Sequence, residues 1–364
     1  MNRTDPKSKA PIMMLSAGNG FIMQSEKYSR DNAGQSLKKY ILLKQGELAY
    51  NHGASKAKQF GCCYELTEPE ARIPYVYHCF KINDHEYTPF IAMALNNAKM
   101  DKQLKRLVSS SVRMDGLLNI SFEDYMSVTL HLPSSTEQKH IADFLKKIDE
   151  RIAAQEKLLA SIKKYKRGVV KAILSKRIRF ADDRGNYYPE WSECTLQEVV
   201  DFLDGQRKPL ESADRAKRQG KYPYYGASGI IDYIDDYIFD EPLLLLGEDG
   251  ANIINRSSPL CFIATGKYWV NNHAHVMRPR KGQNIKFICE LLESLDYTRY
   301  NTGTAQPKLN QEKCRQIALH LPTYEEQCHI AEFLSLVEQK SIHAQTELDS
   351  LLRTKNALMQ QLFI

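Results

Sequence analysis

The chain has 364 residues, of which 43% are hydrophobic and 26% charged, and its formal net charge is +6. This composition is that of an ordinary globular protein with room for two or three domains, and the mild positive charge permits binding to nucleic acid. No apolar run approaches the roughly eighteen residues of a membrane span, and the N-terminus lacks the basic and apolar regions of a secretion signal. We therefore expect a cytoplasmic protein with no membrane segment.

The eight cysteines contain no C-x-x-C pair and no regular spacing. Such cysteines are typical of reduced thiols packed as small apolar residues. His273 and His275 could offer two imidazoles to a metal, but no cysteine or carboxylate pattern nearby would complete the site. We expect neither a metal nor a cofactor.

The most informative feature is an internal repeat. The stretch His131–Leu145, HLPSSTEQKHIADFL, returns as His320–Leu334, HLPTYEEQCHIAEFL, with ten of fifteen positions identical at a constant offset of 189 residues. A repeat of this kind predicts a pseudo-two-fold molecule. Such a molecule suits a two-part target, and duplex DNA is the obvious candidate.

Each copy of the repeat opens a long helix. Ser134 with Glu137, and Thr323 with Glu326, have the spacing of a capping box. After each capping box, mostly apolar seam positions recur every three or four residues. This spacing predicts a coiled coil rather than a globular helix. These seam positions are Ile141, Leu145, Ile148, Ile152, Gln155, Leu159, Ile162, Lys166, Val169 and Ile173 in the first run, and Ile330, Leu334, Val337, Ser341, Ala344, Leu348, Leu351, Lys355, Leu358 and Leu362 in the second.

A helix of about 40 residues is ~60 Å long and needs a helical partner. The natural partner is the other helix of the same chain, returning antiparallel. The alternative is a dimerisation rod in which the helices pair between molecules. Four domains follow: a first globular region at 1–131, a central helical spacer at 132–179, a second globular region at 180–321 and a C-terminal helical spacer at 322–364.

Both globular regions mix short strands and helices, so the predicted class is α+β, with two mixed α/β domains separated by two long antiparallel helices. The runs 125–132 and 315–321 are predicted as strands that lead into each copy of the repeat. Further strands are predicted at 40–43, 48–50, 75–82, 243–246, 261–265 and 274–277, and helices at 89–97 and 285–295.

Loops rich in amide, hydroxyl and aromatic side chains supply the candidate DNA contacts, because amides and Arg read base edges while Lys, Ser and Thr hold phosphates. Gln306 and Arg113 are the favoured base readers, and Lys308 and Lys56 the favoured phosphate contacts. Each loop could instead be a solvated turn, and each tyrosine a packing residue. The candidates are Ser16, Asn19, Tyr50, Asn51, Lys56 and Arg113 in the first region, and Gln206, Arg207, Tyr222, Tyr224, Tyr225, Ser228, Asn271, Asn272, His273, Thr302, Thr304, Gln306 and Lys308 in the second.

No catalytic centre is predicted. The Asp/Asn-Pro-Pro-Tyr loop of adenine methyltransferases, a phosphate-binding loop and a G-x-S-x-G elbow do not occur. Glu241, Glu248 and Asp249 lack a lysine at the spacing of a nuclease metal site, which favours a surface loop.

The duplicated L-P-x-x-x-E-Q-x-H-I-A-x-F-L motif and the lysine-rich stretch Lys163–Gly168 resemble the specificity subunit of type I restriction–modification systems. Trp191 with Leu196, the loop Tyr222–Gly229 and the stretch Gly303–Asn310 add to this resemblance.

The resemblance implies a non-catalytic DNA-binding subunit with two target-recognition domains and two antiparallel helical regions. It implies assembly with two methyltransferase subunits and a restriction subunit on a bipartite target with a fixed spacer. The first region has no counterpart of Trp191 and Leu196, so we expect an N-terminally shortened first domain. Two alternatives stay open: a coiled-coil adaptor or dimerisation protein that does not bind DNA, and the recognition part of a longer catalytic chain.

Overall fold

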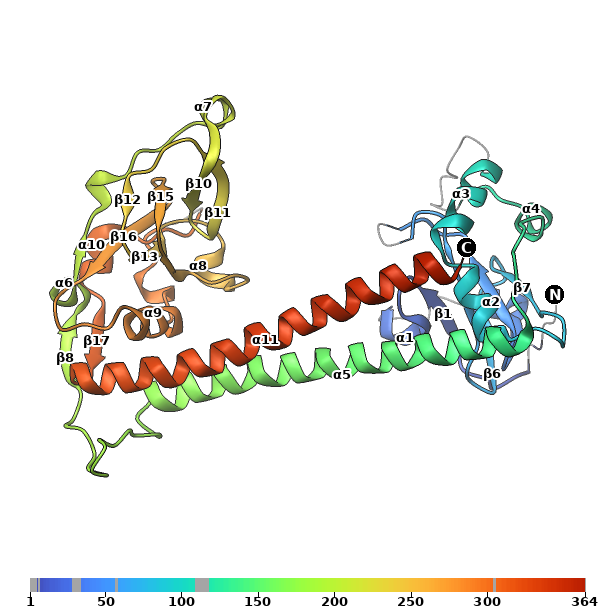
Figure 1. Ribbon diagram of the computed structural model, residues 1–364, viewed down its shortest axis with the longest axis horizontal. Coiled ribbons are helices and arrows are strands. Elements are labelled where there is room, and N and C mark those ends of the chain that lie inside the picture. Colours follow the sequence, from blue (N-terminus) through green and yellow to red (C-terminus); the bar gives the residue numbers. More distant parts are fainter. Residues whose placement is uncertain are drawn as a thin grey trace. The chain divides into compact units, whose positions relative to one another are not determined.

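The computed structural model describes residues 5, 7–27, 34–55, 58–108, 118–303 and 306–363. The chain divides into two compact units. Unit 1 consists of Met1–Lys157 with Thr346–Ile364, and unit 2 consists of Leu158–Gln345. Each long helix contributes one part to each unit (Figure 1). The domain boundaries expected from the sequence stay predictions.

The described residues of unit 1 form three small antiparallel sheets and a group of helices. The sheets pair β1 with β2, β3 with β6, and β4 with both β5 and β7. The elements are β1 (Met13–Ser16), β2 (Gly20–Met23), α1 (Gln24–Lys27), η1 (Gly34–Lys39), β3 (Ile41–Lys44), β4 (Leu48–Asn51), β5 (Cys62–Glu65), β6 (Glu70–Ile73), β7 (His78–Phe80), α2 (Thr88–Ala94), α3 (Ala98–Leu107), α4 (Phe122–Met126) and the first part of α5 (Ser135–Leu174).

In the described part of unit 2 there are two four-stranded sheets, ordered β14-β13-β16-β9 and β11-β10-β15-β12, and a two-stranded pair of β17 and β8. The elements are β8 (Ser192–Thr195), α6 (Leu196–Val199), β9 (Val200–Phe202), η2 (Asp204–Gln206), α7 (Ser212–Lys217), β10 (Gln219–Gly226), β11 (Gly229–Ile234), β12 (Phe239–Asp240), β13 (Leu243–Gly247), α8 (Asn252–Asn255), β14 (Cys261–Ala264), β15 (Lys267–Val270), β16 (Ala274–Pro279), α9 (Ile285–Ser294), η3 (Thr298–Tyr300), α10 (Gln311–Arg315), β17 (Ala318–Leu321) and the first part of α11 (Tyr324–Leu362).

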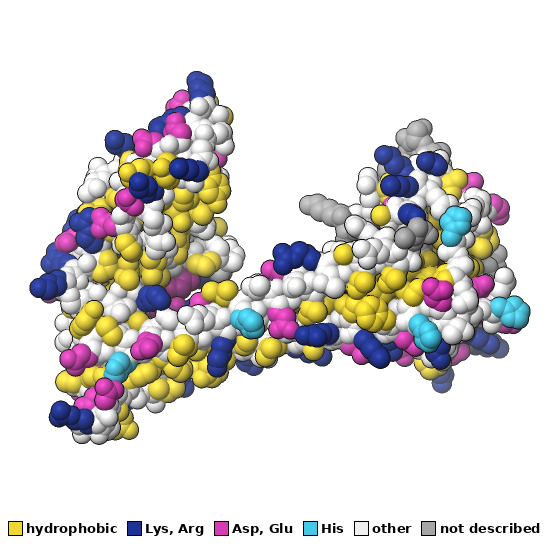
Figure 2. Space-filling model, in the orientation of Figure 1, with side chains coloured by type: hydrophobic (Ala, Val, Ile, Leu, Met, Phe, Trp, Pro, Cys, Tyr) yellow, Lys and Arg dark blue, Asp and Glu magenta, His cyan; other side chains and the backbone are white. Residues whose placement is uncertain are grey.

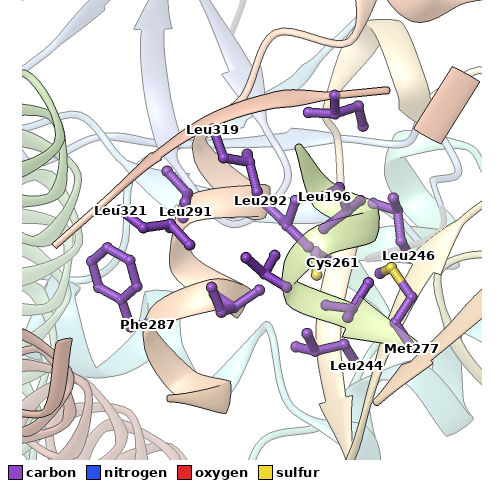
Figure 3. Packing of buried hydrophobic residues seen from close by; sticks show 14 of the residues in the cluster. Leu196, Leu244, Leu246, Cys261, Met277, Phe287, Leu291, Leu292, Leu319 and Leu321 are labelled. Carbon is purple, nitrogen blue, oxygen red and sulfur yellow. The ribbon is translucent and has the colours of Figure 1, made fainter. Parts of the chain in front are cut away.

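Strand β13 lies at the centre of unit 2 because it is apolar on both faces. Leu244 and Leu246 belong to a core with helix α9, whereas Leu243 and Leu245 pack into a second core with the other sheet. Alternate side chains of a strand point to opposite faces, so the sheet lies between α9 and the second sheet. Figure 3 shows the α9 side of this core, where Leu196 reaches in from α6.

The two long helices run antiparallel within each unit. In unit 1, Asp149 of α5 pairs with Lys355 of α11, and Arg151 lies 3.0 Å from Glu347. In unit 2, the Lys166 ammonium lies 2.8 Å from the Glu338 carboxylate and 2.7 Å from that of Glu290. All twenty predicted seam positions are buried or half-buried, so the heptad prediction is confirmed.

The repeated glutamine explains why the motif recurs. Gln138 and Gln327 are both buried, and each donates to the proline carbonyl five residues earlier, at 3.0 and 3.1 Å. Each also accepts from a backbone N–H at the start of a domain helix: Tyr87 at 3.0 Å before α2, and Asn284 at 2.9 Å before α9. The motif therefore fixes one domain helix to the start of one long helix, once in each unit.

Both long helices begin where the sequence predicts. The hydroxyls of Ser134 and Thr323 accept from the N–H groups of Glu137 and Glu326, each at 3.4 Å. Glu326 is buried and accepts from the Trp191 indole N–H at 3.2 Å, whereas Glu137 is exposed. The two motifs therefore have different surroundings at this position.

The α+β class and the two long helices are confirmed, but two local predictions are wrong. Residues 125–132 are not a strand, because α4 ends at Met126 and the following residues pair with no strand. Tyr222–Gly226 is not a loop, because it forms the end of β10 between β11 and β15. In the described part of the chain, no helix is both long and apolar enough to cross a membrane.

Candidate nucleic-acid interface

Five segments that are distant in sequence meet at one edge of the sheets in unit 2. The Glu248 N–H donates to the His273 carbonyl at 2.8 Å, and its own carbonyl accepts from the Leu309 N–H at 2.7 Å. The Gly250 N–H donates to the Pro307 carbonyl at 3.0 Å. The loop after β13 is therefore held between the turn before β16 and residues 307–309.

The other two segments join from either side. The Arg207 guanidinium, after η2, donates to the Ala274 carbonyl at 2.8 Å. The turn between β10 and β11 lies against Gly247, where an added Cβ would come within 2.6 Å of the Ala227 carbonyl oxygen. This position needs a glycine because any side chain would push the turn away. We call these loops the unit 2 loop cluster: residues 204–208, 226–229, 248–250, 271–273, 301–303 and 306–308.

A buried polar network supports the loop cluster from beneath. The Asp204 carboxylate lies 2.7 Å from the His275 Nδ1 and accepts from Gln311 at 2.7 Å and from the Val276 N–H at 2.8 Å. The Arg207 guanidinium lies 2.8 Å from the Glu248 carboxylate. Each charge is matched by an opposite charge and by hydrogen bonds, as buried ions require.

His275 carries a proton on both ring nitrogens in this network. Its Nδ1 faces the Asp204 carboxylate, and its Nε2 lies 2.8 Å from the Leu309 carbonyl, so both partners are acceptors. Burial opposes the charged ring, but the hydrogen bonds and charges of Asp204 and Cys314 outweigh it and raise the pKa of His275 to about 10. The ring is thus a fixed cation that joins η2, β16 and the loop before α10.

Two asparagines shape the loops themselves. The Asn271 side-chain oxygen accepts from the His273 N–H at 2.8 Å. That of Asn301 accepts from the N–H groups of Gly303 at 3.0 Å and Lys308 at 2.8 Å. Such local bonds hold irregular backbone in one conformation. Asn271 is buried, so its place among the DNA-contact candidates is corrected to that of a loop-shaping residue.

Three further candidates of unit 2 are packing or bracing residues. Tyr224 is fully buried, and its hydroxyl accepts from the Leu210 N–H at 2.9 Å. Tyr225 packs against Phe262 and Tyr268, and Arg207 is committed to Glu248 with a side chain that is only 14% exposed. Tyr224 cannot touch DNA, because strand alternation turns it into the core. Arg207 therefore holds the loops in position and does not have a free guanidinium to read bases.

The remaining described candidates of unit 2 lie at the surface. Tyr222 is half-buried beside Tyr237. Lys308 lies 3.4 Å from Glu248, and the His273 Nδ1 lies 2.7 Å from Asp249. The exposed candidates on the loop cluster are Gln206, Ser228, Asn272, His273, Thr302, Gln306 and Lys308. Thr304 lies outside the described residues. The loop cluster therefore presents amides, hydroxyls and two lysines, Lys208 and Lys308, the mixture that suits base edges and phosphates.

Unit 1 offers fewer candidates. Ser16 and Asn19 flank the turn between β1 and β2, and Asn51 is half-buried with its side-chain oxygen accepting from the Gly53 N–H at 3.0 Å. Tyr50 is 1% exposed and stacks on Tyr125 with ring centroids 3.9 Å apart, so it is a core residue and cannot contact DNA. Lys56 and Arg113 lie outside the described residues.

Comparison with known proteins decides the family. The sequence pattern of the type I restriction modification DNA specificity domain matches residues 38–164 and again residues 188–353. The two matches together cover more than half of the chain. The chain belongs to this family. Specificity subunits are the non-catalytic subunits of type I restriction–modification systems.

Relatives within the family are distant. S.HindORF215P of Haemophilus influenzae, named as a type I restriction enzyme specificity subunit, is 32% identical over 145 residues, or 40% of this chain and 36% of that protein. The type I restriction enzyme EcoprrI specificity subunit of Escherichia coli is 28% identical over 146 residues, or 40% and 35%. The alignments thus span about a third of these two relatives. The MjaVIII specificity subunit of Methanocaldococcus jannaschii is 24% identical over 289 residues, or 72% and 67%.

Two solved structures share the fold. The crystal structure of the type I restriction–modification S subunit from M. genitalium superposes with a TM-score of 0.58 at 16% identity, over 99% of this chain and 90% of that one. A chain from work on complex assembly and conformational transition of the type I R-M system gives a TM-score of 0.57 at 14% identity, over 100% and 94%. At such identities the likeness concerns the fold alone.

Sequence reasoning missed one basic surface of this specificity-domain protein. Helix α3 exposes Lys99, Lys102, Lys105 and Arg106 and directly precedes residues 109–117. Figure 2 shows Lys and Arg side chains gathered over this part of unit 1. Helical spacing gives the signal, because Lys99, Lys102 and Arg106 follow at intervals of three and four and so share one face. The buried network of Asp204, Glu248 and His275 had no such signal, since its members are far apart in sequence.

Proposed function

We propose that this chain is the DNA-reading subunit of a type I restriction–modification complex, and that each unit contributes one reader of a bipartite duplex target. The observation that carries the proposal is the unit 2 loop cluster, in which exposed amide and hydroxyl side chains stand on a pre-formed, ion-paired base. Rigid support suits base reading because little conformational entropy is lost on binding. In unit 1, the basic face of α3 and the turn between β1 and β2 would hold the other half-site.

Within the unit 2 loop cluster we assign different roles to two neighbours. Gln306 would read a base edge, because an amide can donate and accept at once. Lys308 would hold a phosphate, since an ammonium gives affinity with little sequence information. Ser228, Asn272, His273 and Thr302 would add contacts at the same surface.

The test compares Gln306→Ala and Lys308→Ala with Lys281→Ala. Lys281 is exposed just beyond the far end of β16, so its removal changes the same charge away from the loops. Target and scrambled duplexes are titrated at several salt concentrations, the target first being selected from a random pool by the assembled complex. Gln306→Ala should reduce discrimination, whereas Lys308→Ala should weaken both duplexes alike and lower the salt dependence by about one charge. Full discrimination by Gln306→Ala would contradict the base-reading role.

We further propose that the antiparallel helices act as a ruler that fixes the spacer between the half-sites. A heptad inserted after Ile162 alone would shift one helix against the other. A matched heptad after Ser341 lies opposite and keeps the seam in register, as the Lys166–Glu338 pair indicates. The doubly extended protein should select a longer spacer in the random-pool experiment. An unchanged spacer would refute the ruler.

Exposed apolar side chains on the helices provide the proposed docking surface for two methyltransferase subunits. Helices that present large apolar groups to solvent are typical of protein interfaces. Phe144 and Leu352 supply them in unit 1, and Leu158, Tyr165, Leu336 and Ile342 in unit 2. Phe144→Ser and Ile342→Ser should weaken co-purification of the methyltransferase subunits without changing the thermal unfolding of this chain. We also propose that the complex takes up a restriction subunit and works in the cytoplasm, where chromosomal DNA is accessible.

A further inference from the structure

Among the described residues, no strand covers the segment that leads into α5 in unit 1, whereas β8 covers its counterpart in unit 2. In unit 2, β17 pairs antiparallel with β8, with Leu319 opposite Cys194 and Leu321 opposite Ser192 (Figure 1). The repeat places Leu130 and Leu132 at the same two positions of unit 1. Within the described residues, 129–132 pair with no strand.

The missing cover leaves apolar side chains at the surface. Leu321 is 5% exposed in unit 2, whereas its counterpart Leu132 is 40% exposed and Met126 is 48% exposed. Leu132 and Met126 border a groove of about 240 Å³ in unit 1. Its apolar wall comes from Phe80, Ile82, Ile91, Leu95, Val128 and Leu130. Figure 3 shows Leu319 and Leu321 packed beside α9 in unit 2, whereas in unit 1 the counterpart Leu132 is open to solvent and Leu130 is half-buried.

Backbone hydrogen bonding indicates which edge is free. The Leu196 N–H donates to the Ile317 carbonyl at 2.9 Å, so in unit 2 residues 317, 319 and 321 point their backbone groups toward β8, and 318 points away. In unit 1, both backbone groups of Thr129, the counterpart of 318, are bonded to the Gln103 side chain of α3, at 2.9 and 3.0 Å. Among the described residues, none hydrogen-bonds to the backbone of Val128, Leu130 or Leu132.

Unit 2 also shows which chemistry fits such an edge. The Trp191 indole donates to Glu326, Glu193 pairs with His320 at 3.1 Å, and Leu196 fills the core beside Leu319 and Leu292. The unit 1 counterparts of Glu326 and His320 are Glu137 and His131, and both are exposed. The carboxylate and the imidazole that an incoming strand would meet are therefore already at the surface.

We propose that this groove of unit 1 binds an extended strand donated by a different protein, not by a second copy of this chain. That strand carries an aromatic residue, an acidic residue two positions later and a leucine five positions after the aromatic, as Trp191, Glu193 and Leu196 do. It adds antiparallel to residues 128–132, so that main-chain bonds supply affinity and the two apolar anchors supply specificity. This surface is separate from the DNA contacts of the proposed function and does not depend on them.

A synthetic peptide spanning residues 187–200, with Cys194 replaced by Ser, is the direct probe. Fluorescence anisotropy with the full chain should give saturable one-to-one binding with a Kd on the order of micromolar, as expected for a short added strand. A matched peptide with Trp191→Ala and Leu196→Ala should bind at least about tenfold more weakly. The protein variants Leu132→Glu and Met126→Glu, both at exposed positions, should fold normally and lose the peptide.

Amide hydrogen exchange separates the other outcomes. Bound peptide should protect the amides of Leu130 and Leu132. Protection at 317–321 alone would mean exchange with the chain's own β8 and would overturn the proposal. Protection of Leu130 and Leu132 before peptide is added would mean that the chain covers the groove itself. A dimer that Leu132→Glu dissociates would identify a second copy as the occupant. Either of these last results also overturns the proposal, as does a failure of the peptide to bind.

Discussion

Unit 1 and unit 2 carry the same glutamine and the same leucine at matching positions of the repeat. Gln138 and Gln327 make the same contacts, to the proline before the long helix and to the start of a domain helix. Leu132 and Leu321 have different surroundings, since Leu132 is exposed and Leu321 is buried. A repeated motif thus fixes those contacts whose partners lie within the motif or on the adjacent helix. The surroundings of its other residues depend on elements outside the repeat.

The largest expected effect is at this leucine pair. Leu321→Ala should lower the free energy of unfolding by about 2–5 kcal/mol, because it leaves a cavity in the core of unit 2. Leu132→Ala should cost under about 1 kcal/mol, since that side chain is largely in water already. Urea unfolding of both variants measures the difference. Equal losses would mean that residues 128–132 are covered in solution.

The glutamine pair should show the opposite behaviour, with similar losses in both units. Gln138→Ala and Gln327→Ala each leave a backbone N–H and a carbonyl without partners in a buried place, at a cost of about 1–3 kcal/mol. Lys139→Ala and Glu332→Ala, at exposed helix positions, serve as controls and should cost little. If only one of the two glutamine variants loses stability, the two units are not equivalent at this position. The motif would then fix a domain helix to a long helix in one unit alone.

His275 should give the stability of unit 2 a pH dependence, because its pKa is raised in the folded state. The pKa of His275 rises from 6.5 to about 10 on folding, so its contribution to stability is fully present below about pH 6.5 and is lost as the pH rises through about 10. His275→Gln removes the titrating group. The difference in Tm between wild type and variant should shrink steadily from pH 6.5 to pH 10. A constant difference would show that the ring is neutral throughout.

The smallest effect is expected at α3. Lys102→Ala with Arg106→Ala should weaken binding to any duplex several-fold and reduce the salt dependence by up to about two charges, without changing sequence preference. The double variant Lys146→Ala with Lys147→Ala, at exposed positions on α5 in the same unit, removes the same charge elsewhere. Equal weakening by both double variants would indicate that only net charge matters.

The long helices could be predicted residue by residue because their signal is local and periodic. Ser134 and Thr323 mark the starts, and a spacing of three and four residues marks the seam, so each position depends on near neighbours. The candidate site was predicted less well. Tyr50 and Tyr224 stand in stretches rich in Gly, Asn and Ser that resemble loops, but strand pairing places both rings in cores. Asn271 and Arg207 have the right chemistry for DNA, yet their polar atoms serve the protein itself.

The sequence by itself determined the two-part plan, the helix starts, the seam and the family, because each of these is written in a motif or in a short-range period. Only the tertiary structure decided which polar residues are free to meet a ligand. It brought Asp204, Glu248, His275 and Gln311 together across more than a hundred residues of chain. It also left Leu132 uncovered where Leu321 is buried. Burial and ion pairing depend on contacts between distant segments, and no local pattern in the chain encodes those contacts.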